Sequence, residues 1–484
     1  MRPIRTLIWF RNDLRVDDNP ALNAAARHAD RGVVAVYAIC PKQWQDHDMA
    51  PIKVDFILRN LKKLSAALEK KNIALKIIKT ATFNDVTGPL RLLANELACD
   101  ALYFNREYEV NERRRDAAVT EAFEADGIEV QTFTDQCVFE PGELRTGANG
   151  FYTIYTPFKR AWFRAFDEDP DRGKPLGLPK KQSDMVSQPD EIPTHVKGFD
   201  IDPTKSKLWP AGERNAKSRL NRFIAQKINS YKDTRDYPMI DGTSTLSPYL
   251  ASGVISQRRC LAAAILANAG QFATGPEGVV QWISELIWRE FYKHILIGFP
   301  RVSMHKAFKP ATEHLDWNQS AKHFQAWRDG KTGYPIVDAA MRQLAQIGWM
   351  HNRLRMIVAM FLSKNLFLDW RCGEQFFMQQ LVDGDLSANN GGWQWAASTG
   401  TDAAPYFRIF NPCAQSKRFD PDAVFIRRFV PELAHVDIAA IHDPSRIPDT
   451  MLKSIDYPKP IVDHAATRRS AIAAFKTLKD EQLR

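Results

Sequence analysis

The sequence lacks the features that would place it among metal-binding, disulfide-bonded or membrane proteins. Its six cysteines include no C-x-x-C pair, which argues against a zinc site and a disulfide scaffold and fits a reducing cytosol. No apolar run approaches the ~18 residues of a membrane span. The first apolar run, Thr6–Phe10, is too short for a signal peptide. We expect a soluble, cytoplasmic protein without a resident metal ion.

Glycine-rich phosphate-binding turns are also missing from the start of the chain. The first glycine is Gly32, so no G-x-G-x-x-G turn follows the first predicted strand, and a Rossmann-type dinucleotide site is not expected there. No G-x-S-x-G motif supports a serine hydrolase. An acidic excess is absent too: the net charge of +9 and the pI near 9.1 favour a polyanionic partner such as nucleic acid.

Short apolar runs alternate with longer amphipathic stretches over residues 1–135. The predicted strands are Thr6–Phe10, Val33–Ile39, Ala74–Ile78, Ala101–Phe104 and Glu129–Phe133. The predicted helices are Val54–Lys70, Asp85–Leu97 and Val110–Ala125. This alternation predicts a doubly wound, parallel-sheet α/β domain with right-handed crossovers.

The pattern changes after residue 135. We predict an interdomain linker over 136–210, because its later part is rich in proline and charge and has no periodic apolar face. Its scattered apolar residues favour a strap that lies across the surface. Residues 211–484 show almost only helical spacing, which predicts an all-α domain. Its helices are expected at Ala216–Asn229, Gln257–Asn268, Val279–Ile297, Ile336–Gln346, Leu354–Lys364 and Thr467–Lys479.

The segment 383–412 combines carboxylates, amides, glycines and two tryptophans without a helical or strand period. Long segments of this kind are usually functional or disordered, and its aromatic residues argue against disorder. Eight of the 12 tryptophans lie within 282–395. Indole stacks well on flat ligands, although a tryptophan-rich helical core would have the same composition. We predict an irregular loop that binds a planar, polar ligand.

Three shorter motifs each allow two interpretations. Ser247 before Pro248 predicts a capped helix start, where the hydroxyl groups just upstream form either a phosphate seat or an ordinary turn. Glu285 shares a helix face with Arg289, as an i,i+4 ion pair or as an acceptor for a base edge. His351 has no partner at metal-ligand spacing, so we interpret it as structural or hydrogen-bonding.

Several motifs resemble those of one known family: WFRNDLR at 9–15, WISELIWREFY at 282–292, GKTGYPIVDAAMRQL at 330–344, WMHNRLRM at 349–356 and the segment 383–412. They are similar to motifs of the class I cyclobutane pyrimidine dimer DNA photolyases, in the photolyase/cryptochrome family. The resemblance covers essentially the whole chain. It implies light-dependent repair of pyrimidine dimers in UV-damaged DNA, by electron transfer from excited FADH⁻ to a dimer flipped out of the duplex.

The resemblance also implies an α/β antenna domain over 1–135 and a helical FAD-binding catalytic domain over 211–484. The implied FAD-binding residues are Tyr231, Thr243, Ser244, Thr245, Leu246, Ser247, Trp282, Glu285, Arg289, Asn352, Arg355, Asp383, Gly384, Asp385 and Asn389. Among them Arg355 and Asp383 are implied to form an ion pair, and Asn389 to face the flavin N5.

The remaining site residues follow from the same resemblance. The implied catalytic residues are Glu285, Asn352, Met356 and Asn389. An electron-transfer chain to the flavin is implied for Trp393, Trp370 and Trp317. Lesion and DNA contacts are implied for Trp288, Trp395, Arg235, Arg353, Arg408 and Gln415. We expect a monomer without an obligate protein partner, associated with the nucleoid through DNA.

Rival functions and the antenna remain open at this stage. A cryptochrome-type photoreceptor would be expected to lose Trp288 or Met356 or to replace Asn389, and a (6-4) photolyase would carry paired histidines within 349–352. A plain flavin oxidoreductase or a structural basic protein would not need the arginine-flanked aromatic residues. His47, Asn111 and Glu112 resemble the branch that binds 5,10-methenyltetrahydrofolate as antenna. Ser303 and Met304 depart from that branch, which leaves a deazaflavin or an empty antenna site as alternatives.

Overall fold

The computed structural model describes residues 4–481 and divides them into two compact units. The first unit comprises the chain up to Asn229 together with Ser244–Pro300 and Val382–Ser387. The second comprises Ser230–Thr243, Arg301–Leu381 and the chain from Ala388 onward. The outermost residues of the two predicted domains, 1–3 and 482–484, lie outside the described part of the chain.

A five-stranded parallel sheet forms the centre of the α/β part of the first unit, with the strand order β3-β2-β1-β4-β5. The strands are β1 (Thr6–Phe10), β2 (Val33–Ile39), β3 (Ala74–Lys79), β4 (Ala101–Asn105) and β5 (Glu129–Phe133). All five strands predicted from the sequence are confirmed to within one residue. Because the order reverses between β1 and β4, the sheet has the switch point at which α/β folds usually bind ligands.

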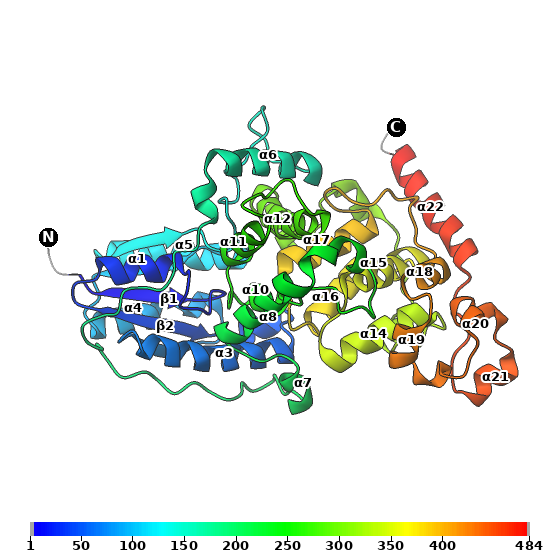
Figure 1. The fold of residues 1–484 in the computed structure, drawn as a ribbon, viewed down its shortest axis with the longest axis horizontal. Coiled ribbons are helices and arrows are strands. Elements are labelled where there is room, and N and C mark those ends of the chain that lie inside the picture. Colours follow the sequence, from blue (N-terminus) through cyan, green and yellow to red (C-terminus); the bar gives the residue numbers. More distant parts are fainter. Residues whose placement is uncertain (1–3, 482–484) are drawn as a thin grey trace. The chain divides into compact units, whose positions relative to one another are not determined.

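Helices flank this sheet, which Figure 1 draws in blue to cyan. They are α1 (Pro20–His28), α2 (Pro41–Asp46), α3 (Pro51–Glu69), α4 (Thr87–Glu96) and α5 (Val110–Ala125). Leu7, Trp9 and Phe104 form a core with residues of α4 and α5. Tyr103, which points to the opposite face, contacts His28 of α1 at 3.3 Å. Both faces of the sheet are therefore covered, as a parallel sheet requires.

The predicted linker contains a helix that the sequence interpretation missed. Residues Tyr155–Glu168 form α6, which buries Phe158, Trp162 and Phe166. The later part of the linker is the predicted surface strap, and Figure 1 shows it as a long extended trace leading to α7 (Pro203–Lys207). Backbone hydrogen bonds tie it to the α/β part, for example from Asp18 N to Gly177 O at 2.9 Å. The strap is confirmed, whereas α6 corrects the linker prediction.

Beyond the strap the chain is helical, as predicted. The first unit contains α8 (Glu213–Gln226), α10 (Ser247–Ala251), α11 (Gln257–Ala267) and α12 (Glu277–Gly298). Helices of the later chain include α14 (Pro335–Ile347), α15 (Asn352–Met360), α16 (Trp370–Met378), α17 (Leu386–Ala397), α18 (Pro412–Phe419) and α22 (His464–Glu481). The helix expected over Leu354–Lys364 ends at Met360 and continues as a π-helical turn, Phe361–Asn365.

Helix α17 overturns the prediction of an irregular loop over 383–412. The sequence shows no helical period there because the helix is buried on more than one side. Trp393, Gln394, Ala396 and Ala397 are all buried, so apolar and polar residues do not separate into an inner and an outer face. Two consecutive glycines, at 391 and 392, further weaken the helical signal.

Candidate active site

The short segment Val382–Ser387 carries three of the implied cofactor residues and belongs to the first unit. Asp385 lies 3.2 Å from Lys293 Nζ and 3.8 Å from an Arg289 nitrogen, and both cations project from α12. The carbonyl oxygen of Gly384 accepts a hydrogen bond from Lys53 of α3. The segment is thus held by side chains from two helices that lie far from it in the sequence.

Helix α12 presents the residues of the WISELIWREFY motif. Trp282 is buried and packs against Phe223 with ring centroids 5.0 Å apart. Glu285 Oε1 accepts a hydrogen bond from Gln281 at 2.7 Å. Trp288 stacks on Tyr155, with centroids 3.7 Å apart and planes inclined by 12°.

Arg289, on the same helix, directs its hydrogen bonds largely to backbone. One nitrogen donates to the carbonyl oxygen of Gln136 at 2.7 Å, and another to that of Leu250 at 3.3 Å. The charge of Arg289 lies near Asp385. Arg289 therefore joins α12 to neighbouring segments of the first unit.

The turn Thr243–Ser247 departs from the predicted capping arrangement. Leu246, rather than Ser247, is the N-cap residue of α10, and the helix is only five residues long. The turn is nevertheless unusual, because Thr245 has a φ of 48°, a left-handed conformation that is rare for a β-branched residue. Its hydroxyl bonds to the Ser244 carbonyl oxygen at 2.8 Å and accepts a hydrogen bond from Arg219.

Helix α15 carries the WMHNRLRM motif in the second unit. His351 is its N-cap, and Nδ1 accepts a hydrogen bond from Arg353 N at 3.2 Å. Burial lowers the pKa of His351 to about 4, so the ring is neutral and able to accept. The interpretation of His351 as a hydrogen-bonding residue is confirmed. Asn352 is exposed, while Arg355 and Met356 are half-buried.

Arg353, the implied DNA contact on this helix, already has protein partners. Its guanidinium donates to Asp236 at 2.8 Å and lies over the ring of Phe419 at 4.5 Å. A phosphate contact by Arg353 would therefore compete with Asp236.

Three tryptophans of the second unit come together in its hydrophobic core. Trp317, Trp370 and Trp393 belong to one cluster of buried side chains. Trp393 contacts Phe377 edge-on at 5.1 Å and Trp327 at 6.0 Å between ring centroids. Trp327 is fully buried, and the family resemblance assigned it no role.

Asn389 and its neighbour Asn390 join α17 to α16 by hydrogen bonds. Its Nδ2 donates to the carbonyl oxygen of Glu374 at 3.0 Å. Asn390 donates to the Glu374 carboxylate at 3.0 Å and accepts from Gln394 at 2.8 Å. Sequence reasoning missed Glu374 and Asn390, and their only signal was polar character within an otherwise apolar pattern.

The other implied residues of the second unit are more dispersed. Tyr231 is largely buried, and the Arg235 guanidinium lies 5.3 Å from its ring. Trp395 is half-buried against the helical core, and Arg408 is exposed in a loop. Gln415, on α18, has a buried Oε1 without a hydrogen-bond partner among the described residues.

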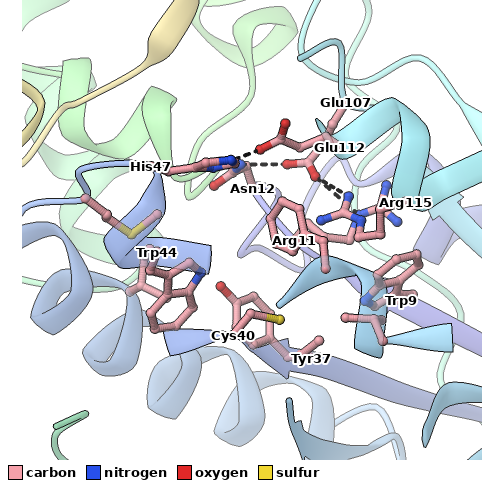
Figure 2. A pocket seen from close by; sticks show the side chains of 15 residues that line it. Trp9, Arg11, Asn12, Tyr37, Cys40, Trp44, His47, Glu107, Glu112 and Arg115 are labelled. Atoms are coloured by element: carbon pink, nitrogen blue, oxygen red, sulfur yellow. Dashed lines mark hydrogen bonds and ion pairs between the residues drawn. The ribbon is translucent and has the colours of Figure 1, made fainter. Parts of the chain in front are cut away.

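Two of the three implied antenna residues, His47 and Glu112, line a pocket in the α/β part, shown in Figure 2, and the exposed Asn111 contacts His47. His47 Nε2 lies 2.9 Å from Asn111 Nδ2, and His47 Nδ1 lies 3.6 Å from Glu112 Oε1. The pocket is also lined by Trp9, Arg11, Tyr37, Cys40, Trp44, Glu107 and Arg115. It lies at the carboxyl ends of β1, β2 and β4, next to the switch point of the sheet.

Comparison with known proteins identifies the family. Residues 6–176 match the family model described as DNA photolyase, and residues 282–477 match the FAD binding domain of DNA photolyase. The deoxyribodipyrimidine photo-lyase of Salmonella typhimurium is 45% identical over 474 residues, which cover 98% of each chain. The chain belongs to the DNA photolyase family.

Solved structures of photolyases and cryptochromes share this fold. A class III photolyase from Agrobacterium tumefaciens superimposes with a TM-score of 0.83 at 35% identity, covering 99% of this chain and 98% of that one. A Synechocystis cryptochrome superimposes with the same TM-score of 0.83 at 26% identity, covering 98% of this chain and 100% of that one. The predicted combination of an α/β domain and a helical domain is confirmed.

The side chains at the positions that the resemblance implies for FAD suit that cofactor. Asp383 and Asn389 are 7% and 8% exposed, so a carboxylate and an amide are buried at these positions. Carboxylates accept hydrogen bonds from ribose and ribityl hydroxyls, while the hydroxyl-rich turn at 243–247 offers donors for phosphate. The strained φ of Thr245 supports a ligand-binding role for this turn.

Two groups of the pocket that His47 and Glu112 line have shifted pKa values. Burial raises the pKa of Glu112 to about 8, and repulsion from Glu109 and Glu107 acts in the same direction. Burial lowers the pKa of His47. Near neutral pH the pair is therefore largely uncharged, in surroundings that suit an aromatic ligand with a few polar groups.

Glu112→Gln should reduce the pH dependence of stability. The pKa of Glu112 is about 8 in the folded protein and 4.5 in the unfolded chain. Its contribution to the free energy of unfolding is therefore complete below pH 4.5 and is lost as the pH rises to 8. Over this range the free energy of unfolding of the wild type should fall by roughly 1–4 kcal/mol because Glu112 loses its proton. The variant should not show this decrease. Thermal unfolding across this pH range measures the effect.

The matched control is Glu121→Gln, which changes an exposed glutamate on the same helix. Its pH profile should follow that of the wild type. If the Glu112→Gln profile also followed the wild type, Glu112 would not be the group that titrates.

Among residues 4–478, whose side chains the structure describes, no three His, Cys, Asp or Glu are grouped so that they could hold a metal ion. None of the helices in this part of the chain is long and apolar enough to span a membrane.

Proposed function

We propose that this protein is a light-dependent lyase that repairs cyclobutane pyrimidine dimers in DNA. The observation that carries the proposal is the 45% identity, over 98% of both chains, to a protein named deoxyribodipyrimidine photo-lyase. The retained residues support it: Trp288, Met356 and Asn389 are those that a cryptochrome-type photoreceptor was expected to lose or replace. The fold alone does not decide, because a cryptochrome shares it.

FAD is the proposed cofactor, held by the family's FAD-binding residues. The chemistry expected of the bound flavin, as FADH⁻, is the light-driven transfer of one electron to the dimer and its return after the ring has split. Asp383, Asp385 and Arg289 would fix its polar groups, with Arg355 paired to Asp383. Asn389, whose Nδ2 is already bound to the Glu374 carbonyl oxygen, would present its amide oxygen towards the flavin N5.

The lesion would be bound outside the duplex stack, as in base-flipping enzymes, of which photolyases are a recognised example. Trp288 and Trp395 would flank the dimer and Met356 would pack against it. Glu285 would hydrogen-bond a base edge, with Asn352 close by. The basic and polar residues Arg235, Arg353, Arg408 and Gln415 would contact the DNA backbone.

The antenna pocket would hold 5,10-methenyltetrahydrofolate. The contact of His47 with both Asn111 and Glu112 supports a common ligand site. The pocket's aromatic side chains, together with polar groups that include Arg11, Glu107 and Arg115, suit a flat heteroaromatic ring that carries polar substituents. A deazaflavin is the competing ligand, and extraction of the bound chromophore followed by its absorption spectrum distinguishes the two.

We further propose that the enzyme acts as a monomer in the cytoplasm and associates with the nucleoid through DNA. The net charge of +9 supports attraction to DNA. Sedimentation with and without DNA tests the oligomeric state.

A repair assay on DNA that contains a thymine dimer tests the function. The reduced holoprotein should restore intact thymines under blue light and not in the dark. A photoreceptor without repair activity would bind flavin but leave the dimer intact. A (6-4) photolyase would repair only (6-4) photoproducts, and a basic structural protein would show no flavin absorption.

Trp288→Ala should weaken binding to dimer-containing DNA by roughly 1–3 kcal/mol, the range for the loss of one aromatic side chain that stacks on a base. Affinity for undamaged DNA should change much less, because stacking requires the flipped dimer. Titrations of both DNAs at fixed salt measure the difference. Leu92→Ala, which changes an exposed apolar side chain on α4, is the control, and equal weakening of both DNAs would refute the role of Trp288.

A further inference from the structure

A lysine of the α/β part contacts the flavin-binding segment across 331 residues of sequence. Lys53 lies on α3 and is 6% exposed. Its Nζ donates a hydrogen bond to the carbonyl oxygen of Gly384, between the two carboxylates of Asp383-Gly384-Asp385. No motif or resemblance in the sequence assigned Lys53 a role.

The charges around Lys53 show that this buried amine belongs to a connected cluster. Lys293 Nζ lies 2.8 Å from Glu109 and 3.2 Å from Asp385. Burial lowers the pKa of Lys53, while attraction to Asp385 opposes this effect. Burial of this amine costs free energy, and its hydrogen bond to Gly384 and its attraction to Asp385 offset part of that cost.

We propose that Lys53 is a positioning residue for FAD: by holding the peptide of Gly384, it fixes the two neighbouring carboxylates for cofactor binding. This inference rests on the proposed role of Asp383 and Asp385 in binding FAD. Glycine is the residue whose backbone is least restricted, so an unheld Gly384 would let the flanking carboxylates move independently. A segment fixed before the ligand binds loses less conformational entropy on binding, which slows release.

The hydrogen bond requires a donor but not a positive charge. A glutamine at position 53 could donate from its amide to the same carbonyl oxygen, whereas a methionine fills the space without a donor. This difference separates positioning from packing, because both replacements remove the charge and are close to lysine in length.

The test compares flavin release from holoprotein in three variants. The dissociation rate is followed by the rise in flavin fluorescence on release, well below the unfolding temperature. Lys53→Met should accelerate release roughly 10- to 100-fold, the range for a lost hydrogen bond that involves a charged group. Lys53→Gln, which keeps a neutral hydrogen bond of about half that strength, should accelerate release clearly less, by roughly 3- to 10-fold. Lys62→Met, which removes an exposed lysine on the same helix, should not change the rate.

Two further measurements separate the outcomes. If Lys53→Met lowers the unfolding temperature but leaves flavin release unchanged, Lys53 is structural only and the inference is wrong. It is also wrong if Lys53→Gln releases flavin as fast as Lys53→Met. Asp385→Asn tests the premise: unchanged release would remove the proposed FAD role of Asp385 and the inference with it. Faster release from Asp385→Asn, with normal release from Lys53→Met, would refute only the role of Lys53.

Discussion

Replacement of Trp393 by phenylalanine is expected to abolish the light-driven reduction of oxidised FAD. Phenylalanine is much harder to oxidise than tryptophan, so the electron-transfer chain that the resemblance implies for Trp393, Trp370 and Trp317 would lose one of its members. The side chain of Trp393 is 2% exposed and is surrounded by aromatic rings. A phenylalanine at this position would keep part of that packing. Absorption spectra recorded during illumination with an external reductant measure flavin reduction directly.

Two controls make the Trp393 result specific. Repair by Trp393→Phe holoprotein that has been chemically reduced should persist, because that reaction does not need the tryptophan chain. Trp209→Phe alters a buried tryptophan of the first unit and should photoreduce normally. Normal photoreduction in Trp393→Phe would exclude Trp393 from the chain.

Gly373→Ala is expected to destabilise the helical core around the same tryptophan. A Cβ at this position of α16 would lie 2.1 Å from Cη2 of Trp393, far inside van der Waals contact. Alanine favours a helix by about 1 kcal/mol over glycine. Overpacking a buried site costs about 1–3 kcal/mol, occasionally more. Because the indole of Trp393 is enclosed and cannot swing away, we expect the clash to exceed the gain in helix propensity.

Gly392→Ala is the matched control for this substitution. Residue 392 also lies in a helix, α17, and a Cβ there would meet no atom within 4 Å. The variant should be as stable as the wild type or more stable by up to about 1 kcal/mol. Thermal unfolding measures the stability of both variants. Equal stability of the two would show that the side chains around Gly373 rearrange to accommodate the added Cβ.

Local patterns in the sequence were sufficient wherever each element separates an inner from an outer side or lies wholly in a core. The five strands were found because short runs such as Val33–Ile39 are almost entirely apolar and alternate with amphipathic helices. Helix α5 was located because its buried residues follow a helical spacing, and α12 because most of its length lies in the core. The motifs that resemble photolyases carried the prediction of family, and this prediction depended on residue identity rather than on any physical pattern.

Local patterns failed where tertiary burial overrides them. Helix α17 is enclosed on several sides, so its sequence has no amphipathic period. Helix α6 is different: its sequence is amphipathic, with Phe158, Trp162 and Phe166 buried on one face, and it was missed because the linker prediction was based on the proline-rich, charged composition of the strap that follows it. At Ser247 a good capping residue precedes proline, yet the cap position falls on Leu246, directly after Thr245 with its left-handed φ of 48°.

Contacts between distant segments were decided only by the tertiary structure. His47 meets Asn111 and Glu112 because parallel strands bring their carboxyl ends to one edge of the sheet. Nothing near Lys53 in the sequence indicates that its amine binds the backbone at Gly384. Sequence periodicity reports which side of an element is buried, whereas the partner on that side depends on how the whole chain packs.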